Sequence, residues 1–222
     1  VSFGKKSEFE GRVGGPNVLA ERDAKLVRYL AKHKHISPFG HSYVKFHVKA
    51  PIFVARQLVK HKFLRWNEIS RRYVDDAPEF YVPDVWRGRS ADKKQGSSDE
   101  VVDMLHWIVE DPELSSEGHT EYDNVSDTPS RWSSYVNDRA LDLYNAMLNS
   151  DVAPEQARMV LPQSTMTEWI WSGSLDAFAA MCRLRCASDT QYETRLVADQ
   201  ISDKMRQLFP VSWDALMDAD DD

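Results

Sequence analysis

The sequence predicts an α+β fold in a single domain. Residues 42–48 alternate with period two, as a half-buried strand does, and five longer stretches carry apolar residues at helical spacing. With 222 residues, 42% of them hydrophobic, the chain is long enough for one substantial core and short for two. We therefore expect one globular domain, residues 1–222, that combines a sheet with several helices.

The first half of the chain predicts a helix, a strand and a second helix. Residues 18–33 place apolar side chains on one helical face, and residues 42–48 follow as the strand. Pro51 suits the first turn of the next helix, which we expect to end near Lys62. The basic stretch that follows would then start at a helix end and continue into a loop.

The second half opens with a polar, acidic stretch, residues 86–129, which we expect to be a surface insertion with the possible role of a lid. A short helix through residues 101–108 is expected to interrupt it. Three longer helices follow, over residues 132–148, 175–185 and 191–208. The two cysteines, Cys182 and Cys186, lack the partners of a zinc site, and we interpret them as small structural residues.

Overall charge limits the classes of ligand. A net charge of -7 argues against broad binding of nucleic acid or anionic membranes, since both need an extended basic surface. No apolar run approaches the ~18 residues of a membrane span, and no signal peptide opens the sequence, so we expect a cytoplasmic protein. The histidines at 33, 35, 41 and 47 match no metal-ligand spacing, and we predict no metal site.

One short stretch, residues 57–73, is strongly basic in this acidic chain. Its cations are Lys60, Lys62, Arg65, Arg71 and Arg72. They can neutralise phosphates, while Gln57, Asn67, Glu68 and Ser70 supply the directional hydrogen bonds that a base or ring edge needs. A solvated helix end is the alternative interpretation. The expected polyanion is small.

This stretch resembles the signature of the flavin-dependent thymidylate synthases, which is Arg-His-Arg, seven residues, then Ser within Asn-Glu-x-Ser-x-Arg-Tyr. Here the motif reads Lys60-His61-Lys62, seven residues and Ser70, and residues 67–73 are intact. Three more blocks resemble the family in the same order. They are residues 47–57, residues 157–162 (Ala-Arg-Met-Val-Leu-Pro), and Leu184-Arg185 followed by Gln191-Tyr192-Glu193.

The resemblance implies an antiparallel or mixed sheet with flanking helices, and a homotetramer whose subunits share active sites. It implies conversion of dUMP to dTMP with FAD as cofactor, NADPH as reductant and methylenetetrahydrofolate as carbon donor. Val1-Ser2-Phe3-Gly4 resembles a family segment that follows an opening strand and part of a helix. We therefore expect an N-terminal truncation of roughly 25 to 30 residues.

The resemblance also implies roles for individual residues. Arg185 is the expected catalytic residue, because its family counterpart faces the pyrimidine and activates C5 electrostatically. The substrate-binding positions are Gln57, Lys60, Glu68, Ser70, Arg71, Arg72, Arg158 and Arg185. The cofactor-binding positions are His35, Ser37, Lys60, His61, Lys62, Glu68 and Ser174.

Several positions depart from the family pattern. Both signature arginines are lysines, which keep the charge and lose the planar fork. Ser174, Asp176 and Ala180 stand where the family has Asn and Arg residues that contact the flavin. Two alternatives therefore stay open beside thymidylate synthesis. One is a homologue that methylates or hydroxymethylates another pyrimidine nucleotide such as dCMP, and the other is a catalytically silent nucleotide-binding relative.

Overall fold

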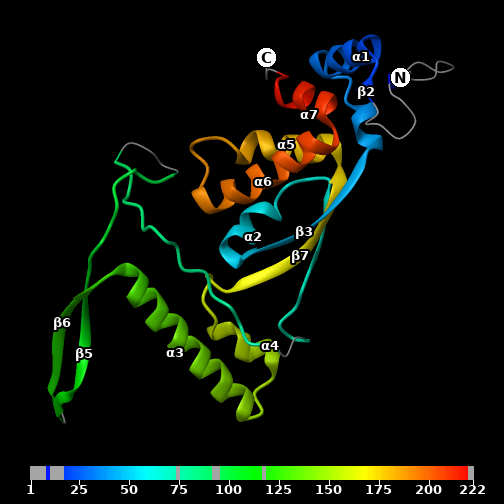
Figure 1. Cartoon of the computed structure of the whole chain (residues 1–222). Helices are drawn as coiled ribbons and strands as arrows, with labels where there is room; N and C mark the ends of the chain where they lie inside the picture. Colours follow the sequence, from blue (N-terminus) through cyan, green and yellow to red (C-terminus); the bar gives the residue numbers. More distant parts are fainter. Residues whose placement is uncertain (1–8, 11–17, 74–75, 92–95, 117–118, 220–222) are drawn as a thin grey trace. The chain divides into compact units, whose positions relative to one another are not determined.

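The main sheet is built around strand β7 (Met166–Ser174), whose alternate residues are buried. In the computed structural model of the chain, β7 lies between β3 (Tyr43–Pro51) and β4 (Leu64–Glu68), and Figure 1 shows β3 and β7 side by side. Trp169 and Trp171 of β7 are each 1% exposed, which makes the strand a core element. β4 pairs antiparallel with β7, with Trp66 opposite Trp171.

The structure describes residues 9–10, 18–73, 76–91, 96–116 and 119–219. The chain divides into two compact units, which we call unit 1 and unit 2. Unit 1 comprises residues 1–50, 54–68 and 168–222, and unit 2 comprises residues 51–53 and 69–167. The expectations of one domain and of an insertion at 86–129 stay predictions, and the N-terminal segment 1–4 lies outside the described residues.

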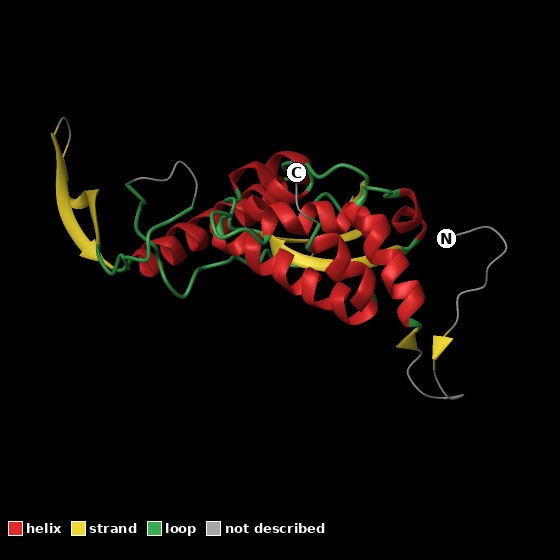
Figure 2. Ribbon diagram, turned by 90° about the horizontal axis from the view of Figure 1, so that it is seen from above, coloured by secondary structure: helices red, strands yellow, loops and turns green. Residues whose placement is uncertain are grey.

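Unit 1 contains the sheet and most of the helices. Its elements are β1 (Phe9–Glu10), β2 (Val18–Leu19), α1 (Glu21–Lys32), η1 (Ser37–His41), β3, most of α2 (Ile52–Leu58), β4, most of β7, α5 (Leu175–Arg185), α6 (Tyr192–Leu208) and α7 (Pro210–Met217). Figure 2 shows helices lying over the strands of this sheet. Helix α5 is the most buried of them, because most of its residues from Leu175 to Cys182 are apolar and inaccessible.

Aromatic packing joins α5 to the sheet. Phe178 of α5 meets Trp171 and Phe46 edge to face, with ring centroids 5.5 and 5.2 Å apart. Trp66 stacks on Trp169 at 4.3 Å. Edge-to-face and offset-stacked rings contribute beyond their burial, so these contacts fix the position of α5 relative to β3, β4 and β7.

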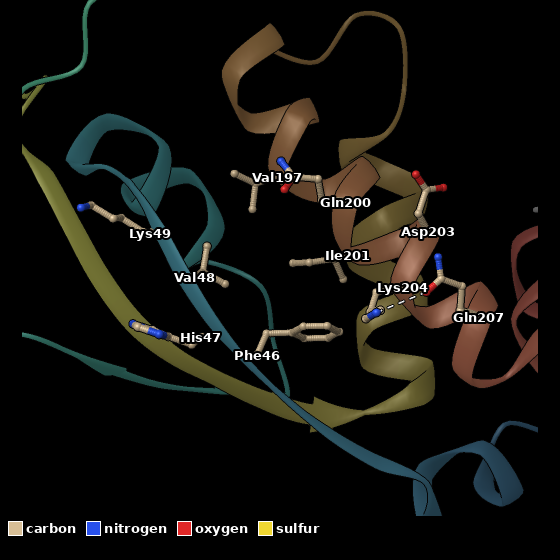
Figure 3. Close-up of a pocket in the computed structure, with 10 residues that line it drawn as sticks. All are labelled: Phe46, His47, Val48, Lys49, Val197, Gln200, Ile201, Asp203, Lys204 and Gln207. Carbon is tan, nitrogen blue, oxygen red and sulfur yellow. Dashed lines mark hydrogen bonds between the residues drawn. The ribbon is translucent and has the colours of Figure 1, made fainter.

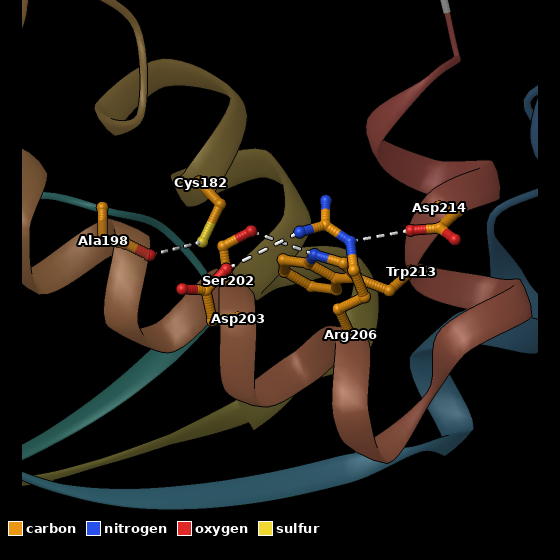
Figure 4. Close-up of polar contacts among 7 residues, drawn as sticks. All are labelled: Cys182, Ala198, Ser202, Asp203, Arg206, Trp213 and Asp214. Carbon is orange, nitrogen blue, oxygen red and sulfur yellow. Dashed lines mark hydrogen bonds and ion pairs between the residues drawn. The ribbon is translucent and has the colours of Figure 1, made fainter.

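Polar contacts join α5, α6 and α7 (Figure 4). The Trp213 indole donates to Ser202 Oγ at 3.1 Å, and the Cys182 thiol donates to the Ala198 carbonyl at 3.6 Å. Hydrogen bonding to Cys186, followed by burial, raises the pKa of the Cys182 thiol. A thiol held in the protonated form is a poor nucleophile, so Cys182 has a structural role.

Unit 2 consists of a long helix, a short helical segment and a β-hairpin. Its elements are β5 (Leu105–Ser116), β6 (His119–Asp127), α3 (Pro129–Asn149), α4 (Pro154–Ala157) and η2 (Arg158–Val160). Thr128 caps α3 by accepting from the Arg131 amide at 3.3 Å. The helix expected at 101–108 is wrong, because Val101 bridges to Arg87 and Leu105 starts a strand that pairs with β6.

Other boundaries also differ from the predictions. Val18–Leu19 forms β2, so the first helix starts at Glu21 instead of residue 18. Pro51 ends β3 instead of opening a helix, and α2 stops at Leu58. β4, β7 and α7 are absent from the predicted elements. No helix in the described part of the chain is long and apolar enough to cross a membrane.

Candidate active site

The basic motif begins where α2 ends. Residues 59–63 form a turn after Leu58, and the chain then enters β4. Phe63 adopts a left-handed conformation with φ of 63°, which reverses the chain between helix and strand. Lys60 and Lys62 are exposed on this turn, while His61 between them is half-buried. The turn therefore presents two cations to solvent and directs the histidine inward.

His61 contacts Arg185, which lies 124 positions further along the chain. Arg185 is the last residue of α5, and its Nε donates to His61 Nε2 at 2.9 Å. Burial first, and the Arg185 charge second, lower the pKa of His61. The imidazole is therefore neutral at pH 7, with Nε2 as the acceptor and the proton on Nδ1. Among the described residues, the two terminal nitrogens of Arg185 have no protein partner.

A second series of hydrogen bonds links α2 to the start of α6. Gln57 donates through Nε2 to Gln191 Oε1, and Gln191 donates to Glu193 Oε2 at 3.2 Å. Glu193 is only 8% exposed. Gln191 and Glu193 are absent from the predicted site residues, although both belong to the last block that resembles the family. That block is the signal that could have identified them.

Glu68 is the last residue of β4, at the end of the strand away from the motif turn. Its Oε2 accepts from the Trp66 indole at 3.0 Å, and β4 pairing puts it opposite Trp169. This hydrogen bond within one strand holds an exposed carboxylate in a defined direction. A positioned acceptor of this kind can bind the N–H or hydroxyl of a ligand.

The predicted flavin contacts His35, Ser37 and Ser174 belong to two adjoining elements of unit 1. His35 precedes η1, Ser37 is its first residue, and Ser174 is the N-cap residue of α5, against which η1 packs. Within the described chain, the Ser174 side chain forms no capping hydrogen bond. These three side chains offer the donors and acceptors that hydroxyl and carbonyl groups of a flavin require.

Asp176, on the first turn of α5, differs from these three residues because it carries a negative charge. Its Oδ1 is buried and has no hydrogen-bond partner within the described residues, and a Cβ built at Gly40 of η1 would lie 3.8 Å from it. A carboxylate at this position would repel a phosphate placed next to it, because both groups are negatively charged. The cations and donors at Lys60, His61 and Lys62 are thus of the kind that an anionic flavin ring requires, whereas the carboxylate of Asp176 would repel a phosphate placed next to it.

The remaining predicted residues belong to unit 2. Arg72 approaches Ser70 Oγ through its backbone N–H at 3.4 Å and through Nε at 3.5 Å, and its guanidinium lies 5.0 Å from the Tyr73 ring centre. Arg71 donates to the Asp76 carbonyl. The structure therefore brings Ser70 and Arg72 together in one polar turn.

Arg158 begins the short helix η2. Its Nε donates to the Glu155 carbonyl at 3.3 Å, within its own helical segment, and the side chain is exposed. This single bond leaves most of the guanidinium fork available for an anion. The arrangement agrees with a phosphate contact.

A cavity of about 460 Å³ lies between β3 and α6 (Figure 3). Phe46 of β3 points toward Ile201 of α6, while His47 and Lys49 contact Glu168 at 2.8 and 3.8 Å. The charge of Lys49 is thus already paired. None of the predicted site residues lines this cavity, so the motif turn and not this hollow marks the candidate site.

Comparisons with known proteins agree with the sequence motifs. The family model described as "Thymidylate synthase complementing protein" matches residues 1–211. The flavin-dependent thymidylate synthase of Kosmotoga olearia is 36% identical over 197 residues, which cover 89% of this chain and 77% of the relative. The enzyme of the same name from Thermus thermophilus is 36% identical over 193 residues, or 87% of this chain and 63% of the relative.

A solved structure extends the likeness to the fold. The crystal structure of a UMP/dUMP methylase, PolB from Streptomyces cacaoi, bound with 5-Br dUMP superposes with a TM-score of 0.69 at 30% identity. The match covers 88% of this chain and 79% of that chain. This likeness confirms the predicted α+β class. The chain therefore belongs to the flavin-dependent thymidylate synthase family.

Proposed function

We propose that the protein is a flavin-dependent thymidylate synthase that converts dUMP to dTMP. The observation that carries this proposal is the 2.9 Å hydrogen bond between Arg185 and His61. It joins the signature motif to the arginine that the family resemblance assigns to the pyrimidine. Two residues distant in sequence thus form one polar site in unit 1.

Arg185 can activate the pyrimidine. His61 holds its Nε, which leaves the two terminal nitrogens to donate to a carbonyl of the base and to N3 once N3 has lost its proton. C5 is a good nucleophile only when the ring is electron-rich, and a guanidinium beside N3 and a carbonyl stabilises the N3-deprotonated, anionic ring from which C5 attacks. This mechanism needs no covalent adduct, in accord with the protonated thiol of Cys182.

The reaction also requires a reductant. The C5 hydrogen leaves as a proton, and one hydride equivalent from NADPH converts the methylene carbon of methylenetetrahydrofolate to a methyl group. Bound FAD would supply the hydride, because no side chain can. Lys60, His61 and Lys62 would hold the flavin together with His35, Ser37, Glu68 and Ser174. The exposed lysines favour an anionic ring.

The nucleotide phosphate needs concentrated positive charge. We assign it to Ser70, Arg72 and Arg158, whose hydroxyl and guanidinium groups donate charge-assisted hydrogen bonds to a dianion. Arg71 adds charge to the same turn. Gln57 would orient the base or sugar, and its link to Gln191 fixes its amide group.

The proposal also covers the oligomeric state and the cellular compartment. We infer a homotetramer with active sites shared between subunits, working in the cytoplasm on free nucleotide. Residues 86–129 would act as a surface insertion with the role of a lid. Sedimentation analysis of the purified protein tests the assembly, since a tetramer has four times the 25.5 kDa mass of the chain.

A second candidate substrate is UMP. The solved structure of similar fold favours it, since that protein is a methylase of both UMP and dUMP. Replacement of both signature arginines by Lys60 and Lys62 also leaves room for altered nucleotide choice. Methylation or hydroxymethylation of dCMP, and a silent nucleotide-binding protein, are the other outcomes of the same experiment.

Tritium release from C5-labelled nucleotides tests the proposal. The protein is incubated with FAD, NADPH and methylenetetrahydrofolate, and with labelled dUMP, UMP or dCMP in parallel. We expect release from dUMP, with dTMP as the product. Release from dCMP alone would assign another substrate, and no release from any nucleotide would indicate the silent relative.

A further inference from the structure

Phe63, on the motif turn, combines two features that are uncommon for an aromatic residue. The residue is 84% exposed, so its ring does not contribute to the core. Its backbone φ is 63°, in the left-handed region that Gly and Asn adopt with less strain than a bulky residue does. Backbone strain of this kind is concentrated at functional sites, so the exposed ring calls for a functional explanation.

The end of a helix does not explain this conformation. Two other described residues besides glycine have a positive φ, namely Lys34 at 56° and Asp151 at 60°. Each is polar and lies two residues after the end of a helix, α1 or α3, where left-handed residues are common. Phe63 instead lies well beyond the end of α2 at Leu58 and directly before β4.

Gly173 of β7 fixes the backbone of Phe63. A Cβ built at Gly173 would lie 3.1 Å from the Phe63 carbonyl oxygen, which is closer than ordinary van der Waals contact. Leu64 pairs with Gly173 in the sheet. The missing side chain at Gly173 therefore lets the motif turn lie directly against β7, and this contact holds Phe63 in place.

The residues around Phe63 are those assigned above to the flavin. Lys60, His61 and Lys62 precede it in the chain, and both lysines are exposed. Ser174 directly follows Gly173 in the neighbouring strand, so it lies at the same end of the sheet as Phe63. The ring of Phe63 is therefore presented to solvent beside two parts of the proposed flavin site.

The proposed site otherwise has no large apolar surface. None of the residues assigned above to nucleotide or flavin is a Phe, Tyr or Trp. Sites for small molecules and cofactors are nevertheless lined mainly by hydrophobic and aromatic side chains, with a few polar groups that fix orientation. An exposed phenyl ring next to two lysines supplies such a surface together with positive charge.

We propose that Phe63 is a binding residue whose ring contacts the flat face of a fused heterocycle held at the motif turn. The flavin of FAD and the pterin of the folate share this chemistry, and aromatic contacts of this kind contribute beyond the area that they bury. The inference rests on the proposed function, because that function supplies both ligands.

Phe63→Asn separates the ring from the backbone conformation. Because asparagine adopts the left-handed conformation more readily, the variant should keep its Tm or gain about 2 °C. Loss of the ring should weaken the binding of FAD or of methylenetetrahydrofolate about fivefold or more. Flavin fluorescence and calorimetric titration of the whole chain measure the two affinities. A loss confined to FAD assigns the ring to the flavin, and a loss confined to the folate assigns it to the pterin.

Three further variants isolate the aromatic ring. Phe63→Tyr keeps the ring and should bind both ligands within about twofold of the unaltered protein, whereas Phe63→Leu keeps only apolar bulk and should lose affinity as Phe63→Asn does. Asp151→Asn places the same new side chain at a similar backbone conformation after α3. It should leave both affinities unchanged.

The outcomes that contradict the inference differ from those that contradict the proposed function. If Phe63→Asn binds FAD and the folate as tightly as the unaltered protein, or loses several degrees of Tm, this inference alone is overturned. A smaller assembly of Phe63→Asn in sedimentation analysis would show that a second copy of the chain covers the ring, which also overturns it. Absence of FAD and folate binding by the unaltered protein would overturn the proposed function and this inference together.

Discussion

The two ends of helix α5 differ in how their polar groups are satisfied. At the C-terminal end, Arg185 donates to a neutral His61 at 2.9 Å. At the N-terminal end, the Ser174 side chain caps no backbone group, and Asp176 Oδ1 is buried without a partner in the described chain. One helix therefore has a completed polar contact at one end and an unsatisfied one at the other.

The two ends of α5 also differ in how closely their sequences resemble the family. Leu184-Arg185 resembles the family pattern, whereas the resemblance implies that Ser174 and Asp176 stand where the family has flavin-contacting residues. We infer that pyrimidine activation is retained while flavin binding has changed. The two ends can be altered independently, because they are separated by the 11 residues of a rigid helix.

The largest effect is expected from Arg185→Lys. Lysine keeps the charge but lacks the planar fork with which one guanidinium can donate to His61 and to two neighbouring atoms of the pyrimidine, so turnover should fall about 100-fold or more. Folding and FAD affinity should persist. Tritium release and flavin titration of the same variant measure both quantities.

Arg183→Lys is the matched control, because Arg183 lies on the same helical turn and donates instead to the Leu216 carbonyl at 2.7 Å. Its turnover should stay within a few-fold of the unaltered protein. If Arg185→Lys also keeps its turnover, Arg185 does not activate the base.

The next largest effect concerns the phosphate. Arg158→Ala should raise the KM for dUMP about tenfold and change kcat less, because a phosphate contact is equally strong before and during the reaction. Steady-state kinetics at saturating folate and NADPH separate the two constants. An unchanged KM would remove Arg158 from the nucleotide site.

A pH series examines the His61–Arg185 contact. Burial lowers the pKa of His61 below the ordinary 6.5, so below that pH the unfolded chain binds more protons than the folded one. The free energy of unfolding should therefore fall as pH drops from about 6.5 toward the lowered value. Urea denaturation at several pH values measures this fall.

His61→Gln should reduce that pH dependence, because glutamine has no proton to gain. His33→Gln, at the exposed end of α1, is the control and should preserve the dependence. The same slope in the unaltered protein and in His61→Gln would show that another group titrates.

The smallest effect is expected at the other end of α5. Asp176→Asn removes the negative charge of a half-buried side chain beside Gly40 of η1 and should strengthen FAD binding about threefold or more. Asp199→Asn, on the exposed face of α6, should leave FAD affinity unchanged. Equal effects from the two substitutions would indicate a general change in charge instead of a local one.

The sequence predicted the helices best where their periodicity is local. The predicted helix 175–185 has the same bounds as α5, and the helix predicted for 191–208 differs from α6 by one residue. β7 was missed, although Thr167, Trp169 and Trp171 alternate with less buried residues. The helix predicted near 101–108 was wrong because Leu105 and the residues after it pair with β6 in a hairpin, and the apolar spacing of residues 101–108 does not reveal that pairing.

The site was predictable in part. The resemblance to the family predicted His61 and Arg185 as site residues, but no periodicity could show that they touch across 124 positions of sequence. The roles of Gln191 and Glu193 were missed because a polar helix start is usually a cap.

FAD titration tests most directly whether this chain, with its altered flavin end, is a flavin enzyme. We predict saturable quenching of flavin fluorescence with a Kd below about 100 μM, which corresponds to about -5.5 kcal/mol. The Kd should be the same in Arg185→Lys. Absence of binding at about 100 μM would contradict flavin dependence and would leave the chain as a nucleotide-binding relative without its cofactor.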